Sequence, residues 1–365
     1  MTTKTYLHSI VLFITCISSC ATYVYGQTGK VTATNSTRHS QLDKYPPRPG
    51  SFELKLLFSF PTPAQEENGI YLVQGRHITK DAQNHLFISD MRGNAILKFD
   101  LGGLYLGKIG RSGQGPGDFS LPHFFHITAD NTMIVGETGN MRFHLLDTNG
   151  TYLGSFKIFR GYLSWTTDSR GRIFAVPRLH PETKNIVEVL SKEGELLGSF
   201  GEPLRFEHEI ALYNDASVCI NHRSEIIVGF KHIPIIRAYS TEGTLLRETR
   251  IPGKIFEDKE QSNLENQSRV LRRERTYYKP IISALQPTDK GVVFIHNYPR
   301  LEFYELDDAG SILESYWINL SDEYIADSFV RIDSKESGLR FYVLQMYPES
   351  RVDVFSPISI SKEDH

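Results

Sequence analysis

The sequence predicts an all-β fold made of repeated four-stranded units, and three observations support this prediction. The chain of 365 residues contains 22 Phe and 18 Tyr, residue types that favour strands. A turn that contains glycine recurs along the chain at a nearly constant spacing. An apolar strand that follows a polar turn lies upstream of each glycine turn, as in "DAQNHLFISD" and "DSRGRIFAVP". A repeat of about 40 to 50 residues with four short strands is typical of a propeller blade.

The glycine turns set the period of the repeat. They occur in "DLGGLYLGKIG", "DTNGTYLGSF", "SKEGELLGSFG", "STEGTLLRETR" and "DDAGSILESYW". The first three intervals are about 45 to 50 residues long, and the last is longer because of an insertion. The turn glycines are Gly103, Gly150, Gly194, Gly243 and Gly310.

The number of repeats predicts six blades. Five blades carry the full motif, whereas the sixth, "FVRIDSKESGLRFYVLQMYPESRVDVFS", lacks a fourth strand before the chain ends. The strand "SFELKLLFSF" (Ser51 to Phe60) has no blade of its own and can complete the sixth. Closure of a ring removes exposed strand edges. The sequence therefore predicts that residues 51–358 form one six-bladed β-propeller of four-stranded antiparallel blades, closed by the N-terminal strand.

The glycine-rich stretch "GRSGQGPGDFSLP" (Gly110 to Pro122) raises the question of a phosphate-binding loop. Neither Lys-Ser nor Lys-Thr follows the glycines, and strand and turn signals follow where a helix would be needed. The stretch is therefore interpreted as a connection between blades. With the following "VGETGNMRFHLLDTNGTYLGSF" it resembles an NHL repeat, in which Gly139, Asn140 and Arg142 match the Gly-Asn-x-Arg core. The resemblance implies an NHL-like propeller.

The N-terminus predicts export. Residues 1–20 contain the apolar run "SIVLFITCI" and end in "ISSC", which resembles a bacterial lipobox whose last residue, Cys20, carries lipid. Signal cleavage after "VYG", which would leave Gln27 first, is the alternative. The polar residues 21–50 are expected to form a flexible linker, and residues 359–365 are expected to form a tail. We expect a lipoprotein or secreted protein of the cell envelope, with Cys219 as a buried, unpaired thiol.

One insertion interrupts the repeat at about residues 254–278. Its sequence, "IFEDKEQSNLENQSRVLRRERTYY", contains good helix formers and neither Gly nor Pro. We expect a helix on the face where blades join. It is either a solvated surface helix or a lid or partner contact.

Cationic side chains mark the loops between the second and third strands. In a propeller these loops surround the mouth of the central channel, and positive groups in a concave mouth favour an anionic ligand. The formal net charge of −3 gives no reason to expect nucleic acid. The candidate ligand-binding residues are Arg92, Arg142, Arg178, His180, Lys231, His232, His296, Arg300 and Arg351.

The sequence favours a non-catalytic binding protein, with a metal enzyme as the alternative. The resemblance extends to six-bladed lactonases and lyases that hold calcium or zinc in the channel. The metal candidates are Asp90, Glu137 and His126, with His232 and His296 next in line, but no compact ligand spacing appears. The expected function is extracytoplasmic binding of a protein, peptide or anionic glycan by a monomer without a cofactor.

Overall fold

The computed structural model describes residues 41–178, 184–206, 214–271, 278–319, 325–347 and 349–358. Residues Tyr45–His365 form one compact unit, and the description below concerns that unit. The predicted leader with Cys20, most of the predicted linker, His180 and the predicted tail lie outside the described residues.

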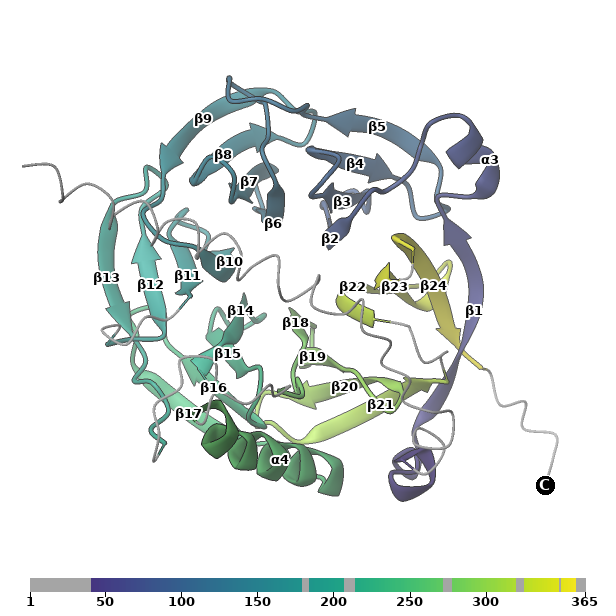
Figure 1. Cartoon of the computed structure of the whole chain (residues 1–365), viewed down its shortest axis with the longest axis vertical. Coiled ribbons are helices and arrows are strands. Elements are labelled where there is room, and N and C mark those ends of the chain that lie inside the picture. Colours follow the sequence, from purple (N-terminus) through teal and green to yellow (C-terminus); the bar gives the residue numbers. More distant parts are fainter. Residues whose placement is uncertain are drawn as a thin grey trace, which may run out of the picture. The chain divides into compact units, whose positions relative to one another are not determined.

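The strands form a six-bladed propeller, which confirms the predicted fold class (Figure 1). Blade 1 contains β2 (Gly75–Lys80), β3 (Leu86–Asp90), β4 (Ala95–Phe99) and β5 (Tyr105–Ile109). Blade 2 contains β6 (Pro122–Ile127), β7 (Thr132–Glu137), β8 (Arg142–Asp147) and β9 (Tyr152–Lys157). Blade 3 contains β10 (Tyr162–Thr167), β11 (Ile173–Pro177), β12 (Val187–Leu190) and β13 (Leu196–Phe200).

The remaining blades continue the same antiparallel order. Blade 4 contains β14 (Ala216–Ile220), β15 (Ile226–Phe230), β16 (Ile235–Tyr239) and β17 (Leu245–Arg250). Blade 5 contains β18 (Ala284–Pro287), β19 (Gly291–His296), β20 (Leu301–Asp307) and β21 (Ile312–Ile318). Blade 6 contains β22 (Ile325–Ser334), β23 (Gly338–Tyr347), β24 (Arg351–Pro357) and, from the other end of the chain, β1 (Phe52–Phe60). The first strand of each blade lies nearest the central axis (Figure 1).

The N-terminal strand closes the ring, as the sequence predicts. β1 pairs in antiparallel fashion with β24, from Leu54 opposite Pro357 to Phe60 opposite Val352. Its first residues, Phe52 and Glu53, also pair in parallel with β21, so the sheets of blades 5 and 6 are joined. The edge that the C-terminal strand would otherwise expose is therefore covered. The short helix α3 (Pro63–Glu67) leads from β1 to blade 1.

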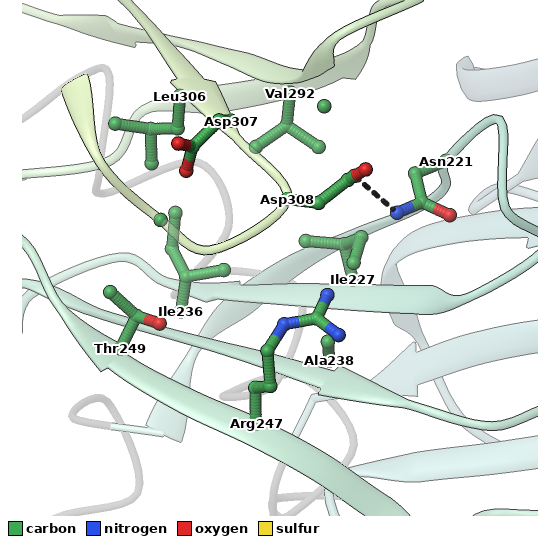
Figure 2. A pocket seen from close by; sticks show the side chains of 12 residues that line it. Asn221, Ile227, Ile236, Ala238, Arg247, Thr249, Val292, Leu306, Asp307 and Asp308 are labelled. Carbon is green, nitrogen blue, oxygen red and sulfur yellow. Dashed lines mark hydrogen bonds between the residues drawn. The ribbon is translucent and has the colours of Figure 1, made fainter. Parts of the chain in front are cut away.

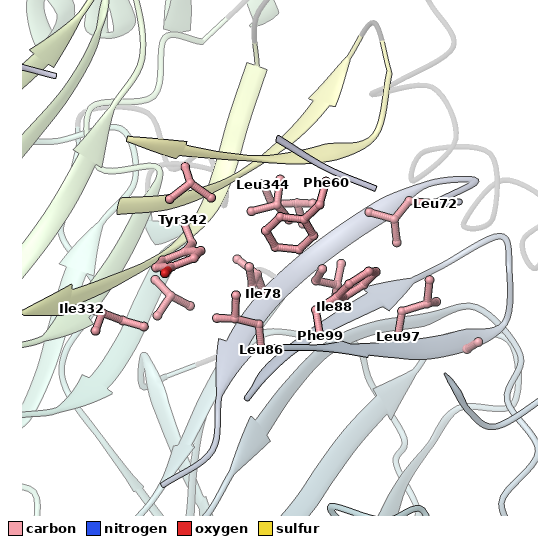
Figure 3. Packing of buried hydrophobic residues seen from close by; sticks show 14 residues of the cluster. Phe60, Leu72, Ile78, Leu86, Ile88, Leu97, Phe99, Ile332, Tyr342 and Leu344 are labelled. Carbon is pink, nitrogen blue, oxygen red and sulfur yellow. The ribbon is translucent and has the colours of Figure 1, made fainter. Parts of the chain in front are cut away.

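The closing strand is anchored by a hydrophobic cluster between blades 6 and 1 (Figure 3). Phe60 is fully buried there, and its ring centroid lies 4.9 Å from that of Phe99. Tyr342 and Leu344 of β23 face Ile78 and its neighbours across the same cluster. Burial of large apolar side chains is the main favourable term in folding, so this cluster stabilises the closed ring.

The repeated turn glycines have a physical reason in the contact between successive blades. Gly103 has a φ of +81° and Gly243 one of +89°, values that residues with a side chain rarely adopt. A Cβ atom at Gly103 would also lie 2.9 Å from Phe60, and one at Gly243 would lie 2.7 Å from Phe200. Both phenylalanines end the outer strand of the preceding blade. Glycine therefore allows each turn to pack against the blade before it.

The insertion after β17 forms helix α4 (Lys254–Leu271), which packs against blades 4 and 5. Phe256 is buried against Phe294 and Tyr304, with ring centroids 6.1 and 5.2 Å away. Asn263 is also buried, and its amide donates to the carbonyl oxygens of His232 and Lys279. Among the described residues, no helix is long and apolar enough to cross a membrane.

Substitution of Phe60 tests the closure. We expect Phe60→Ala to lower the free energy of unfolding by about 3 to 5 kcal/mol, because it leaves a cavity at the junction of blades 6 and 1. Urea denaturation measures the change. Leu57→Ala is the control on the same strand: Leu57 is 46% exposed, and we expect a change of less than about 0.5 kcal/mol. Equal unfolding free energies for the two variants would contradict this account of the closure.

Candidate functional site

The antiparallel order places two kinds of chain segment at one end of the ring. The first strands begin there, and the second strands end there. We call this end the channel mouth. Equivalent backbone hydrogen bonds join the two segments in successive blades: Arg178 N donates to Gly161 O at 2.9 Å, and Lys231 N donates to Asp215 O at 2.8 Å. The segments that carry these residues are therefore held in register around the mouth.

Five polar residues from four blades interact at the channel mouth. Arg76 Nη2 lies 2.9 Å from His123 Nε2. Burial, followed by the charges of Arg76, Arg178 and Lys231, lowers the pKa of His123 to about 3. The mouth cluster comprises Arg76 on β2, His123 on β6, Arg178 after β11, Lys231 after β15, and Asp215 before β14.

The contact with Arg76 fixes the tautomer of His123. A guanidinium only donates, so Nε2 of His123 accepts, and the neutral ring carries its proton on Nδ1. Ser89 ties the same strands together, because its hydroxyl accepts from His77 N and donates to His123 O. His123 is therefore a neutral hydrogen-bond donor that is held among cations.

Asp215 is the acidic member of the mouth cluster. Burial raises its pKa to about 6, and the charges of Lys231 and Arg178 act in the opposite direction. An acid that titrates close to neutral pH beside two cations is a common feature of functional sites. The cluster therefore combines cationic side chains with one acid whose pKa is raised.

Two further imidazoles lie along the innermost strands beyond the mouth cluster. Burial lowers the pKa of His77 to about 3, with smaller contributions from His123 and His126. Burial also lowers the pKa of His126 to about 4. The ring of His77 packs against Phe124, with centroids 3.9 Å apart. Both imidazoles are therefore uncharged at neutral pH, and positive charge is concentrated at the mouth itself.

Arg142, a predicted ligand-binding residue, holds the glycine-rich connection instead. Its guanidinium donates to Glu137 through Nε, to Gln114 O through Nη1 at 2.9 Å, and to Asp118 O through Nη2 at 3.1 Å. The prediction that Arg142 faces a ligand is therefore replaced by a structural role. The stretch Gly110 to Pro122 joins β5 to β6, as its interpretation as a connection between blades requires.

Glu137 is the buried acid to which Arg142 is bound. Burial opposes its ionisation, but hydrogen bonds from His144, Arg142 and the backbone N–H of Ser120 outweigh that effect and lower its pKa. Asn140 also donates to Glu137, at 3.0 Å. A carboxylate with this many donors serves as an internal counterion, which accounts for Glu137 without a metal.

Three further residues that the sequence predicts to bind a ligand, Arg351, Arg92 and Arg300, have different surroundings. Arg351 Nε donates to the buried Asp353 at 2.9 Å, and Ser59 of the closing strand donates to the same carboxylate at 2.5 Å. Arg351 therefore contributes to the closure between β24 and β1. Arg92 lies on the exposed turn between β3 and β4. Arg300 is buried, with its guanidinium 5.7 Å from the ring of Trp317.

His232 and His296 are buried in the region that helix α4 contacts. Lys259 of α4 lies 3.0 Å from Nε2 of His296 and donates to Asn297 O at 2.7 Å. His296 Nδ1 lies 2.9 Å from Ile281 O. Burial lowers the pKa of Lys259 to about 7 and that of His232 to about 3. The two histidines therefore support the docked helix, and only their neighbour Lys231 belongs to the mouth cluster.

The metal candidates do not come together. Asp90 accepts hydrogen bonds from the backbone N–H groups of Val73, Gln74 and Gly93. Glu137 is bound to Arg142, and His126 lies on the inner strand β6. Within the residues that the structure describes, no group of three or more His, Cys, Asp or Glu side chains could hold a metal ion.

A small cleft lies away from the mouth, between blades 4 and 5 (Figure 2). Asn221 and Asp308 border it and are joined by a hydrogen bond of 3.2 Å, and Arg247 lines its wall. The turns that carry Asn221 and Asp308 belong to the end of the ring opposite the mouth. Its volume of about 30 Å³ leaves room for little more than ordered water, and we assign no ligand to it.

Three members of the mouth cluster were absent from the sequence prediction. Arg76 and His123 stand at the start of inner strands, and Asp215 stands directly before one. The loops between second and third strands, on which the sequence prediction rests, carry Arg178 and Lys231. The missed signal was positional: in an antiparallel blade, the start of the first strand lies beside the end of the second.

Comparisons with known proteins agree with the propeller fold. Residues 68–145 match a protein family described as a 6-bladed beta-propeller. The chain matches no curated protein sequence.

Solved structures also resemble this chain. A member of the duf4221 family from Bacteroides vulgatus has a TM-score of 0.55 and 11% identity, over 85% of this chain and 98% of that one. A protein from Bacteroides fragilis proposed to be exported has a TM-score of 0.53 and 11% identity, over 85% and 99% of the two chains. A streptogramin B lyase has a TM-score of 0.52 and 10% identity, over 84% and 98%. At these identities the likeness concerns the fold.

Substitution of Arg142 tests its role in the connection. We expect Arg142→Ala to lower the free energy of unfolding at pH 7 by about 3 kcal/mol, because it removes the cationic partner of the buried Glu137 and three hydrogen bonds to the connection. Urea denaturation measures this loss. Arg170→Ala, on an exposed turn of blade 3, is the charge-matched control and should change stability little. If both variants unfold at the same urea concentration as the wild type, Arg142 does not hold the loop.

The lowered pKa of Lys259 predicts that the stability of the protein depends on pH. Its pKa is about 7 in the folded protein, against an ordinary value of 10.5, so the unfolded chain binds more protons between these values. The free energy of unfolding should therefore rise with pH across this window and fall as pH decreases through 7. We expect the wild type to gain stability relative to Lys259→Met between pH 7 and pH 9, as measured by urea denaturation. Lys254→Met, at a mostly exposed position of the same helix, keeps Lys259 and should follow the pH dependence of the wild type.

Proposed function

We propose that this chain is an extracytoplasmic binding protein whose channel mouth takes an anionic group of a protein, peptide or glycan. In this proposal the mouth cluster recognises the anion and the chain catalyses no reaction. The protein acts as a monomer and has no nucleic acid partner.

The convergence of cations from separate blades is the observation that carries the proposal. Arg76, Arg178 and Lys231 come from blades 1, 3 and 4, and all three act electrostatically on His123. Guanidinium groups bind carboxylate, sulfate and phosphate groups in a planar, two-pronged geometry, and partial exclusion of water strengthens such contacts.

Two polar atoms, one in the mouth cluster and one beside it, support the assignment of a ligand. Among the described residues, Arg76 Nε and His77 Nδ1 are buried and meet no hydrogen-bond partner. Buried polar atoms normally have partners, and an unsatisfied one costs about 1 to 3 kcal/mol. An anion that accepts from Arg76 would remove part of this cost.

The proposed location of the protein outside the cytoplasm rests on the N-terminal sequence. The apolar run that ends in "ISSC" has the order of an export signal, and Cys20 is the proposed lipid attachment point. The similar fold of the Bacteroides fragilis protein that is proposed to be exported is consistent with this location. An anchored propeller would present its mouth to ligands at the cell envelope.

Removal of two mouth cations tests the proposed function. The probe is pyrenetetrasulfonate, a fluorescent anion whose charge does not change with pH, and fluorescence anisotropy measures its binding. We expect Arg178→Ala together with Lys231→Ala to weaken binding by roughly tenfold for each lost cation at low salt. The wild-type affinity should also fall as salt is added.

The control removes a positive charge from the opposite end of the ring. Lys192 lies on the turn between β12 and β13, and its side chain is 70% exposed. Lys192→Ala should bind the probe as the wild type does. If the wild type binds no probe, or if all variants bind it equally, the mouth is not an anion site.

A further inference from the structure

We propose that an apolar row on the mouth side of blade 2 extends the anion site, and that the ligand is a polypeptide segment in which an acidic group stands beside large apolar side chains. The apolar row consists of Leu121, Met141 and Phe159. This inference rests on the proposed function, because the acidic group would bind at the mouth cluster. It selects a polypeptide among the classes of ligand that the proposed function leaves open.

The apolar row crosses blade 2 at the mouth end of the ring. Leu121 lies directly before β6, Met141 lies directly before β8, and Phe159 follows the end of β9. Backbone hydrogen bonds connect the segments that carry these residues: Thr138 N donates to Leu121 O at 3.2 Å, and Ile158 N donates to Met141 O at 2.9 Å. Because β6 is the innermost strand of the blade and β9 the outermost, the row extends from the channel to the outer edge (Figure 1).

All three residues of the apolar row are exposed. Leu121 is 39% exposed, Met141 is 38% exposed, and Phe159 is 96% exposed. A phenylalanine that is exposed to this degree packs on almost nothing in its own chain, so the stability of the fold does not account for it. Exposed large apolar residues that gather in one place mark interaction surfaces.

The backbone at two positions of the row has a conformation that apolar residues rarely adopt. Leu121 has a φ of +56°, and Met141 has a φ of +50°. In blade 1 the residue directly before β4 is Asn94, which has a φ of +51°, and asparagine tolerates this conformation better. Met141 therefore occupies a position at which the backbone favours asparagine. Residues that are held in such conformations gather at functional sites.

The inner end of the apolar row borders the mouth cluster. His123, whose Nε2 lies 2.9 Å from Arg76 Nη2, is the second residue after Leu121. Leu121 N donates to Asn94 Oδ1 at 2.8 Å, which joins blades 1 and 2 beside the cluster. Val73, which is 51% exposed, lies shortly before Arg76 in the chain. Cationic and apolar groups therefore adjoin on one surface, which complements a ligand that carries both an anionic group and apolar groups.

A polypeptide fits this combination better than the other classes of ligand. Its acidic side chains supply carboxylates, and its apolar side chains can pack on Leu121, Met141 and Phe159. A glycan presents hydroxyl groups, to which aliphatic side chains offer no hydrogen bond. A bilayer would need apolar side chains around the whole mouth. Among the described residues of this end, the exposed large apolar side chains lie on blades 1 and 2, apart from Tyr298 of blade 5.

Two labelled peptides of equal charge test the inference by fluorescence anisotropy. The apolar peptide alternates Glu with Leu and Phe, and the polar peptide has Ser in place of Leu and Phe. We expect the wild type to bind the apolar peptide about tenfold more tightly, because the polar peptide buries no apolar surface on the row. Phe159→Ser and Met141→Asn should each weaken the binding of the apolar peptide by about fivefold. Neither variant should change the binding of the polar peptide or of pyrenetetrasulfonate.

Both variants should keep the fold, so that a loss of binding reports on the row. Phe159 is almost fully exposed, and asparagine suits the backbone at Met141. In urea denaturation, the midpoint should be unchanged for Phe159→Ser and unchanged or higher for Met141→Asn. Leu196→Ser is the matched control at the opposite end of the ring, where Leu196 begins β13 and is 63% exposed. This control should bind both peptides as the wild type does.

The results that would overturn the inference are distinguishable. Equal wild-type affinities for the two peptides, or a preference for the apolar peptide that both variants retain, would reject the apolar row and leave the anion site intact. Binding of pyrenetetrasulfonate without binding of either peptide would reject a polypeptide as the ligand. Co-sedimentation with phosphatidylglycerol vesicles that Phe159→Ser abolishes would assign the row to a membrane surface instead. Absence of binding for all three anionic probes would reject the proposed function and this inference with it.

Discussion

The pairing of β1 with β24 is the constraint on which the rest of the structure depends. It joins residues from the two ends of the chain and covers the edge that the sixth blade would otherwise expose. The buried contact between Phe60 and Phe99 then connects the closing strand to blade 1. The inner strands of blades 1 to 4 contact one another in chain order, and closure joins the two ends of the row of blades. The mouth cluster takes its residues from these four blades.

Equivalent positions in successive blades perform different tasks at the mouth. The backbone N–H groups of Met91, Thr138, Arg178 and Lys231 make the same hydrogen bond to the start of the first strand. In blades 1 and 2 the residue before this position is an acid, Asp90 or Glu137, and its carboxylate accepts nearby backbone N–H groups. In blades 3 and 4 the position itself is cationic. The two sides of the mouth therefore differ in charge: carboxylates precede the hydrogen-bonded position in blades 1 and 2, and cations occupy it in blades 3 and 4.

Much of the fold could be predicted from the sequence, because its signals are local. A turn glycine such as Gly103 is needed both for its φ and for contact with the preceding blade. The site could be predicted only in part. Arg142 and Arg178 look alike in the sequence, yet Arg142 is bound to Glu137 and to a connection more than 20 residues earlier. Such partners are fixed by tertiary structure. His123 carried no sequence signal, since a histidine on a strand is common.

The proposed anion site has to function in a chain with a net charge of −3. A global field would not attract an anion, so recognition has to come from local groups that water screens poorly. In the mouth cluster, the ring of His123 is neutral and accepts from Arg76, so it adds no further positive charge beside the cations. A bound anion would offset the mutual repulsion of these cations, and this is the physical reason for assigning the proposed site to this end of the ring.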